Sequence, residues 1–202
     1  MRLEIGIIAL VEEVLGVPAQ RRAKFDWLIN KPLATHFGEY YPMIIDIFDQ
    51  MGGDQRGLSA KAEGHLMPDA YFPPPYHLIF EFDELQHFTA FRRQTLEFYP
   101  EALPLAFERR KYLQFCVEYQ TSAIQKGTER FRRKTADFPF VNGRAAQRAF
   151  FDTFRDVLPP LHGLRPTLRL AEFEVAEILN GTLTGQSAKE LVSSLLTQRL
   201  LS

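Results

Sequence analysis

The chain has 202 residues, of which 46 % are hydrophobic and 24 % are charged, and its formal net charge is −1. This length is enough for one sizeable core, so we expect a single domain over residues 1–202. The near-neutral charge argues against a non-specific nucleic-acid coat protein, although it leaves room for a local basic surface. One cysteine, Cys116, excludes an intramolecular disulfide framework, and the sequence shows neither a signal peptide nor a membrane-spanning run. We therefore expect a cytoplasmic protein.

The first part of the chain, about residues 1–57, has helical periodicity. Apolar positions recur every three or four residues, and the glycines of residues 51–57 end the pattern and open a loop. The expected helices cover residues 3–15, 19–29 and 35–50.

The pattern changes to that of β-strands over residues 65–84. Two runs, 65–72 and 77–84, are rich in aromatic and branched apolar residues. Between them lie Pro73, Pro74 and Pro75, which cannot belong to the interior of a sheet. We therefore expect an antiparallel hairpin with a stiff connection.

Helical periodicity then returns in the rest of a core region of about residues 58–180. The expected elements are helices at 89–99, 105–125 and 143–158, a strand at 167–175, and a C-terminal helix over about 187–201. A capping-box pattern from Ser187 to Glu190 supports the last helix. The sequence thus predicts an α/β (α+β) fold in which several helices flank a small central mixed sheet with an antiparallel hairpin.

Acidic side chains gather on the hairpin. Alternation along the second strand gives one face with Ile79, Glu81 and Asp83 and another with Leu78, Phe80, Phe82 and Glu84. Two carboxylates at this spacing lie about 7 Å apart at the backbone, and Asp69 approaches from the first strand. Like charges this close raise each other's pKa unless a cation binds between them. Carboxylate ligands favour Mg²⁺ or Mn²⁺; the alternative is a solvated strand face with salt bridges.

The same residues carry a resemblance. Pro68-Asp69, the hairpin loop and Glu81-x-Asp83 resemble the motif of the PD-(D/E)XK nuclease superfamily, which has the restriction-endonuclease-like fold. The string from Glu81 to Gln86-His87 is similar to the branch around very-short-patch repair endonucleases. The resemblance covers roughly residues 60–120. It implies a magnesium- or manganese-dependent DNA endonuclease in which Asp69 and Glu81 bind the metal, while Gln86 and His87 line the site.

One position departs from that pattern. The superfamily has a lysine two residues after the glutamate, where it orients or activates the attacking water, and this chain has Asp83. Three replacements stay open: Asp83 as a further metal ligand, His87 as proton acceptor, or a lysine from a later helix. Glu108-x-x-Lys111 is similar to a helical motif that supplies such a lysine in some relatives. The alternatives are a solvated Lys111 and a structural His87.

A fourth metal ligand could come from an earlier helix. In the superfamily such a helix often adds a carboxylate, and Glu39 lies in the expected helix 35–50. The alternative is a solvent-facing glutamate.

Positive charge is concentrated in residues 126–148, which contain seven Lys and Arg residues against two acidic ones. Interleaved phenylalanines and basic side chains are typical of contact with a phosphate backbone. The residues expected to bind nucleic acid are Arg130, Arg132, Arg133, Lys134, Arg144 and Arg148. The alternative is a solvated segment with local ion pairs, for which Arg148–Asp152 and Asp152–Arg155 have suitable helical spacing.

Two functions follow from these patterns. The first is a divalent-metal-dependent DNA endonuclease that hydrolyses phosphodiester bonds, with DNA as its partner and a homodimer left open. The second is a catalytically inactive nuclease-like fold that acts as a nucleic-acid- or protein-binding module. Asp83 at the lysine position favours the second, and the retained carboxylates favour the first.

Overall fold

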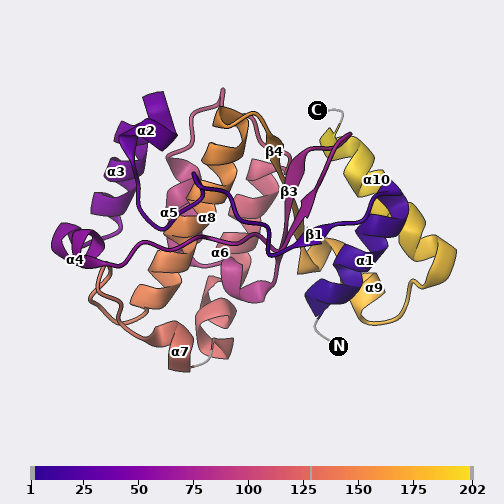
Figure 1. The fold of residues 1–202 in the computed structure, drawn as a ribbon. Helices are drawn as coiled ribbons and strands as arrows, with labels where there is room; N and C mark the ends of the chain where they lie inside the picture. Colours follow the sequence, from indigo (N-terminus) through magenta and orange to yellow (C-terminus); the bar gives the residue numbers. More distant parts are fainter. Residues whose placement is uncertain (1–2, 128, 201–202) are drawn as a thin grey trace.

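A computed structural model describes residues 3–127 and 129–200, apart from the side chain of Arg130. The strands are β1 (Gln20–Arg21), β2 (Ala70–Phe72), β3 (Leu78–Asp83) and β4 (Arg165–Ala171). The α-helices are α1 (Leu3–Leu15), α2 (Ala34–Phe37), α3 (Tyr41–Gln50), α4 (Gln55–Ala60), α5 (Ala90–Glu97), α6 (Arg109–Lys126), α7 (Glu129–Arg132), α8 (Gly143–Leu161), α9 (Ala176–Leu179) and α10 (Gly185–Leu200) (Figure 1). Short 3₁₀ helices, η1 to η3, lie at Gly38–Tyr40, Leu85–His87 and Glu172–Val175. None of the described helices is long and apolar enough to cross a lipid bilayer.

The sheet has the strand order β1-β2-β3-β4 and is mixed. β1 pairs antiparallel with β2, and β2 pairs antiparallel with β3, so the expected hairpin is confirmed. β3 and β4 are parallel, and the chain from α5 to α8 forms the crossover that parallel strands require. The predicted fold class, a small mixed sheet flanked by helices, is therefore confirmed.

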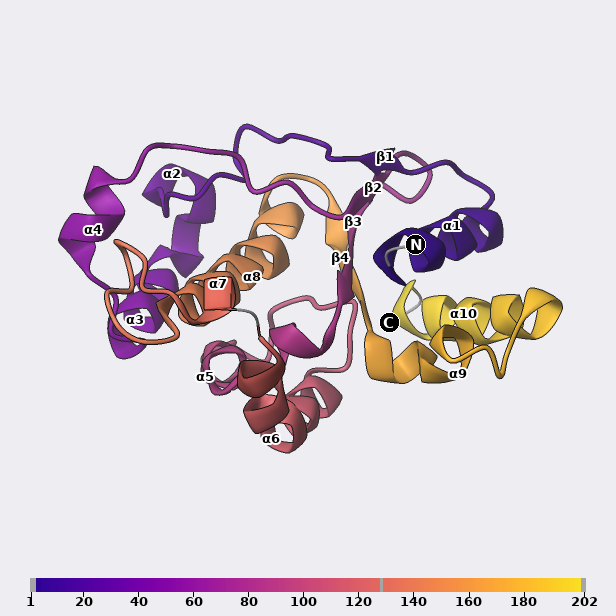
Figure 2. The same ribbon diagram turned by 90° about the horizontal axis from the view of Figure 1, so that it is seen from below.

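Helices cover both faces of this sheet, and Figure 2 shows it nearly edge-on between them. On one face Ile79 packs with a core that includes Phe154 of α8. On the other face Phe80 packs with Ile8 of α1 and Val192 of α10. The predicted alternation along β3 is confirmed, and its odd-numbered side chains, Glu81 and Asp83 included, face the α8 side.

Cys116 lies in the core on the α8 side and is buried. Burial raises the pKa of its thiol to about 12. A thiol with such a pKa carries almost no thiolate at neutral pH, which fits a packing role.

The N-terminal part differs from the sequence prediction in three places. Residues 19–29 are not a helix, because Gln20 and Arg21 pair with Tyr71 and Ala70 and add a strand to the hairpin; tertiary pairing here overrides a helical pattern. The expected helix 35–50 is interrupted at Gly38, whose φ of +51° ends α2. A short helix, α4, forms where a loop was expected, and the Asp54 side chain caps it through the Arg56 N–H.

Candidate active site

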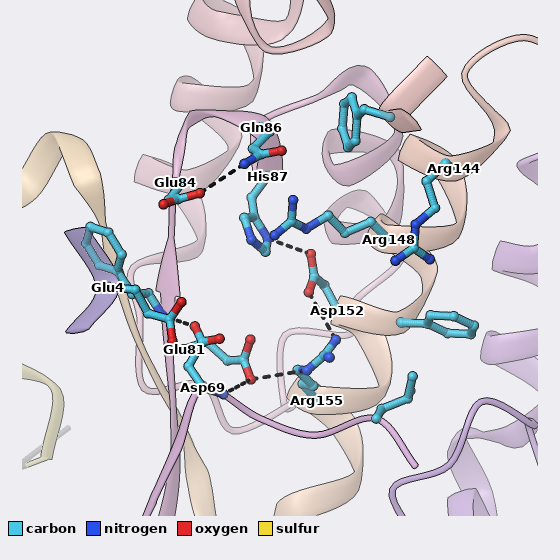
Figure 3. Close-up of a pocket in the computed structure, with 14 residues that line it drawn as sticks. Glu4, Asp69, Glu81, Glu84, Gln86, His87, Arg144, Arg148, Asp152 and Arg155 are labelled. Atoms are coloured by element: carbon cyan, nitrogen blue, oxygen red, sulfur yellow. Dashed lines mark hydrogen bonds and ion pairs between the residues drawn. The ribbon is translucent and has the colours of Figure 1, made fainter. Parts of the chain in front are cut away.

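The carboxylates of Asp69 and Glu81 meet at the end of the hairpin. β2 and β3 pair Ala70 with Phe80, so Asp69, one residue before β2, lies opposite Glu81. The Asp69 N–H donates to Glu81 Oε1 over 3.4 Å, and the Phe82 N–H donates to Asp69 Oδ2 over 2.9 Å (Figure 3). The two acids therefore share one face of the sheet, as the alternation predicted.

These acids line a pocket of about 420 Å³ between β3 and α8 (Figure 3). Its acidic side chains are Glu4, Asp69, Glu81, Glu84 and Asp152; its basic ones are Arg144, Arg148, Arg155 and His87; the others are Leu66, Phe82, Gln86, Phe131 and Phe151. The strand side is mainly anionic and the arginines come from α8. Such a pocket can hold a cation on one wall and an anionic group on the other.

Burial changes the ionisation of both acids. It raises the pKa of Asp69, and the hydrogen bond from the Phe82 N–H partly offsets the effect. Glu81 is only 4 % exposed, and burial raises its pKa well above the ordinary value, although the Arg155 guanidinium lowers it. A cation bound beside the two carboxylates would favour their ionised forms.

Arg155 of α8 places a positive charge next to Glu81. Its Nε lies 3.1 Å from Glu81 Oε1, yet this buried nitrogen makes no hydrogen bond to any described residue. Its terminal nitrogens reach Asp152 Oδ1 and the carbonyl oxygen of Met67, both at 3.5 Å, the outer limit of a hydrogen bond. Arg155 therefore neutralises Glu81 while no short hydrogen bond holds it there among the described residues.

Asp152 and Arg155 are pocket residues that sequence reasoning missed. Their spacing predicted only a local pair, which is present with a separation of 3.5 Å; the other predicted local pair, Arg148 with Asp152, does not form, because Asp152 is engaged by His87. They lie about seventy positions after the hairpin, and only the packing of α8 on β3 brings them to the site. No local sequence signal marks that proximity.

His87 and Gln86 line the pocket, as the resemblance implied. His87 Nδ1 lies 2.9 Å from Asp152 Oδ2 and 3.2 Å from Asp83 Oδ1. Burial by itself raises the pKa of Asp152, but His87 and Arg169 hold it well below the ordinary value. Gln86 donates to Glu84 Oε2 over 2.9 Å. The imidazole is thus fixed through Nδ1, which leaves Nε2 as its other reactive nitrogen.

Asp83 does not line the pocket, so its expected role as a metal ligand is wrong. Arg169 of β4 donates from Nη1 to both carboxylate oxygens of Asp83, over 2.7 and 3.0 Å. Asp156 accepts from Arg169 Nε over 2.6 Å and from Arg92 over 2.6 Å, and all these groups are buried. Asp83 belongs to a buried charge network behind the site, and this engagement withdraws it from solvent and from any ion in the pocket.

Lys111 and Glu39 also lie outside the pocket, which corrects two further expectations. Lys111 Nζ lies 3.1 Å from Glu174 Oε1, beside a different cavity that Arg199 of α10 also lines. Glu39 is exposed in the 3₁₀ helix between α2 and α3. Lys111 is held by Glu174 of η3, and Glu39 is itself exposed although its neighbours Phe37 and Tyr40 pack on the core.

The residues expected to bind nucleic acid divide into three groups. Arg144 and Arg148 line the pocket. Arg132, Arg133 and Lys134 are exposed at the end of α7 and on the loop after it, where Arg132 also donates to the carbonyl oxygens of Ile124 and Gln125 and caps the end of α6. The side chain of Arg130 lies outside the described part of the structure.

The donor set fits magnesium only in part. Among the described residues no group of three His, Cys, Asp or Glu side chains is arranged to hold a metal ion, and Asp83 is paired with Arg169. Mg²⁺, however, commonly binds through one or two carboxylates and keeps several waters. Asp69 and Glu81 meet that requirement, provided that Arg155 moves away from Glu81.

Comparison with known proteins identifies a family but no activity. The model of a family of unknown function, DUF7255, matches residues 46–187, which is more than half of the chain, so the chain belongs to this family. Neither the curated proteins nor the solved structures give a match. The matched region contains the hairpin and all of α8, and therefore most of the pocket.

Proposed function

We propose that this DUF7255 chain is a divalent-metal-dependent DNA endonuclease. The observation that carries the proposal is the opposition of Asp69 and Glu81 in a pocket whose other wall presents arginines from α8. The carboxylates suit Mg²⁺ or Mn²⁺, and the arginines suit a phosphate. The resemblance of the hairpin motif to the PD-(D/E)XK superfamily adds support, and the proposed location is the cytoplasm.

The chemistry assigned to the site uses residues that the fold brings together. A divalent cation, when bound, would polarise a phosphoryl oxygen and lower the pKa of a water. Asp69 and Glu81 would hold that cation, and Arg155, released from Glu81, would neutralise charge that develops on the phosphate. His87, held through Nδ1, would transfer a proton through Nε2. Arg155 would thus supply the positive charge that the missing lysine of the motif provides in the superfamily.

The test is a cleavage assay on supercoiled plasmid and on single-stranded DNA with Mg²⁺, Mn²⁺ and EDTA. We expect cleavage that needs the metal and that Asp69→Ala abolishes. Glu39→Gln serves as the matched control, because Glu39 is an exposed acid outside the pocket. Cleavage that persists in EDTA or in Asp69→Ala would refute the proposal.

A second function is a nuclease-like binding module without catalysis. The position of Arg155 favours it, since a guanidinium already compensates Glu81. In that case DNA or protein binding would persist in EDTA, and no metal would produce cleavage. The two functions therefore separate in the same assay.

A further inference from the structure

Three arginines follow one face of α8 along the pocket: Arg144, Arg148 and Arg155. We call them the α8 arginine row. At 1.5 Å per residue they lie about 6 Å and 10 Å apart along the helix axis. The last of them, Arg155, forms the ion pair with Glu81. The row therefore extends positive charge away from the acid pair in one direction, toward the start of α8 (Figure 3).

Arg148, in the middle of the row, has no compensating partner among the residues that the structure describes. It makes neither an ion pair nor a hydrogen bond within residues 3–127 and 129–200, although it is half-buried and lines the pocket. A guanidinium in such a place favours an anion, and its fork geometry matches a phosphate.

Arg144, one turn earlier, is oriented by buried groups. It donates to Gln147 Oε1, and Gln147 in turn donates through Nε2 to the buried Asp137. Lys61 lies 2.9 Å from Asp137 Oδ2 and compensates its charge. The network leaves Arg144 at the pocket with a fixed direction. The N–H groups of the first turn of α8 already donate to carbonyl oxygens, such as those of Arg133 and Asn142, so the arginine side chains supply the donors for an anion here.

The depth of the acid pair limits what can reach it. Glu81 is 4 % exposed in a pocket of about 420 Å³, within the size range of small-ligand sites. The phosphates of a duplex lie on the outside of a wide double helix, and a nucleotide must leave the base stack to enter a pocket of this size. An unpaired strand has no base pairs to lose. Phe131, from α7, also lines the pocket but is only 6 % exposed, so the recognition here rests on phosphate contacts and not on base stacking.

We propose that the α8 arginine row binds consecutive phosphates of one unpaired nucleic-acid strand, with Arg148 and Arg144 taking phosphates on one side of the phosphate that lies at Arg155. This substrate class rests on the proposed nuclease function. It predicts that single strands and unpaired tails are preferred to the interior of a duplex, and that the contact on Arg148 is made to one defined phosphate.

The test uses fluorescein-labelled octathymidylate in EDTA, so that binding is measured without cleavage. One set of probes carries a single neutral methylphosphonate at each position in turn. We expect Arg148→Met to weaken binding of the all-phosphate strand about tenfold or more. A methylphosphonate at one particular position of the strand should weaken binding to the wild type by a similar factor. The same probe should lose little further affinity for Arg148→Met, because the contact it removes is already absent there. The matched control is Arg110→Met, because Arg110 is an exposed arginine of α6 outside the pocket.

Two outcomes would overturn the inference. One is an equal loss of affinity in Arg148→Met and Arg110→Met, which would mean that any lost positive charge weakens binding, whatever its position. The other is cleavage of a blunt duplex interior as fast as of the single strand with Mn²⁺. If no DNA is cleaved with any metal but the methylphosphonate scan still identifies one phosphate, the endonuclease proposal fails and the strand site stands. If a single strand is cleaved without any dependence on Arg148, the strand site fails and the endonuclease proposal stands.

Discussion

Arg169 of β4 holds both carboxylate oxygens of Asp83 on the neighbouring strand β3, and both side chains are about 1 % exposed or less. This pair explains why an aspartate stands two residues after Glu81. A lysine at that position would face a buried guanidinium, and like charges in the interior are strongly unfavourable. The residue two positions after Glu81 therefore stabilises the fold, and the cation near the acid pair comes from α8 as Arg155.

Breaking this buried pair should be costly. Asp83→Asn leaves Arg169 without one of its anions, and we expect a loss of about 3–5 kcal/mol in the free energy of unfolding. Urea unfolding followed by circular dichroism measures it. Glu97→Gln, which removes an exposed ion pair with Arg93, should change stability by less than about 1 kcal/mol. A loss of similar size in both variants would contradict the importance assigned to the Arg169 network.

Metal binding should raise the melting temperature. A cation that binds only the folded protein stabilises it by mass action, so millimolar Mg²⁺ or Mn²⁺ should shift the thermal transition upward. Asp69→Asn and Glu81→Gln should abolish the shift, and Glu39→Gln should retain it. Because burial raises the pKa of both acids, protons compete with the metal and the shift should shrink as pH falls. No shift in the wild type at millimolar metal would remove the metal site.

Arg155 and Lys111 should differ in their effects on cleavage. Arg155→Met removes the charge beside Glu81, so we expect cleavage to fall by about a hundredfold, in the range of a lost electrostatic contact in a transition state. The same change should strengthen the metal-induced thermal shift, because Glu81 loses its competing cation. Lys111→Met should leave the cleavage rate within about twofold. The reverse order of effects would restore Lys111 as the catalytic cation.

Asp152 should contribute to stability in a way that depends on pH. Its pKa is held well below the ordinary value in the folded protein. The contribution is therefore complete above the unfolded pKa of about 4 and is lost as pH falls below it. Asp152→Asn should be destabilised by about 3 kcal/mol at pH 6, and its stability curve should approach that of the wild type toward pH 3. Parallel curves over that range would contradict this pKa.

The exposed basic loop offers an independent test of DNA contact. Reversing Arg133 and Lys134 to glutamate should weaken binding to all DNA sequences alike and flatten the dependence of affinity on salt, because fewer counterions are released. Arg132 is left unchanged because it caps α6. Fluorescence anisotropy at several salt concentrations measures both quantities, and an unaltered salt slope would place DNA away from this loop.

The sequence by itself determined the hairpin and its two faces. Three consecutive prolines and the period-2 pattern around Glu81 are local signals, and the strand pairing opposes Asp69 and Glu81 as those signals require. The helices with long, regular apolar stripes were predicted for the same reason. Residues 19–29 were not, because the pairing of Gln20 and Arg21 with β2 depends on a strand fifty residues away.

Only the tertiary structure decided which charges share the pocket. Asp83 and Lys111 carry the right chemistry in the sequence, but Arg169 and Glu174 engage them elsewhere. Asp152, Arg155 and Arg148 reach the site because the crossover between β3 and β4 packs α8 on the face that carries Glu81. The type and local spacing of a residue determine which chemistry its side chain can perform. Which partner compensates its charge depends on packing between segments that lie far apart in the chain. That partner decides whether a charged residue belongs to a buried structural ion pair or to a functional site.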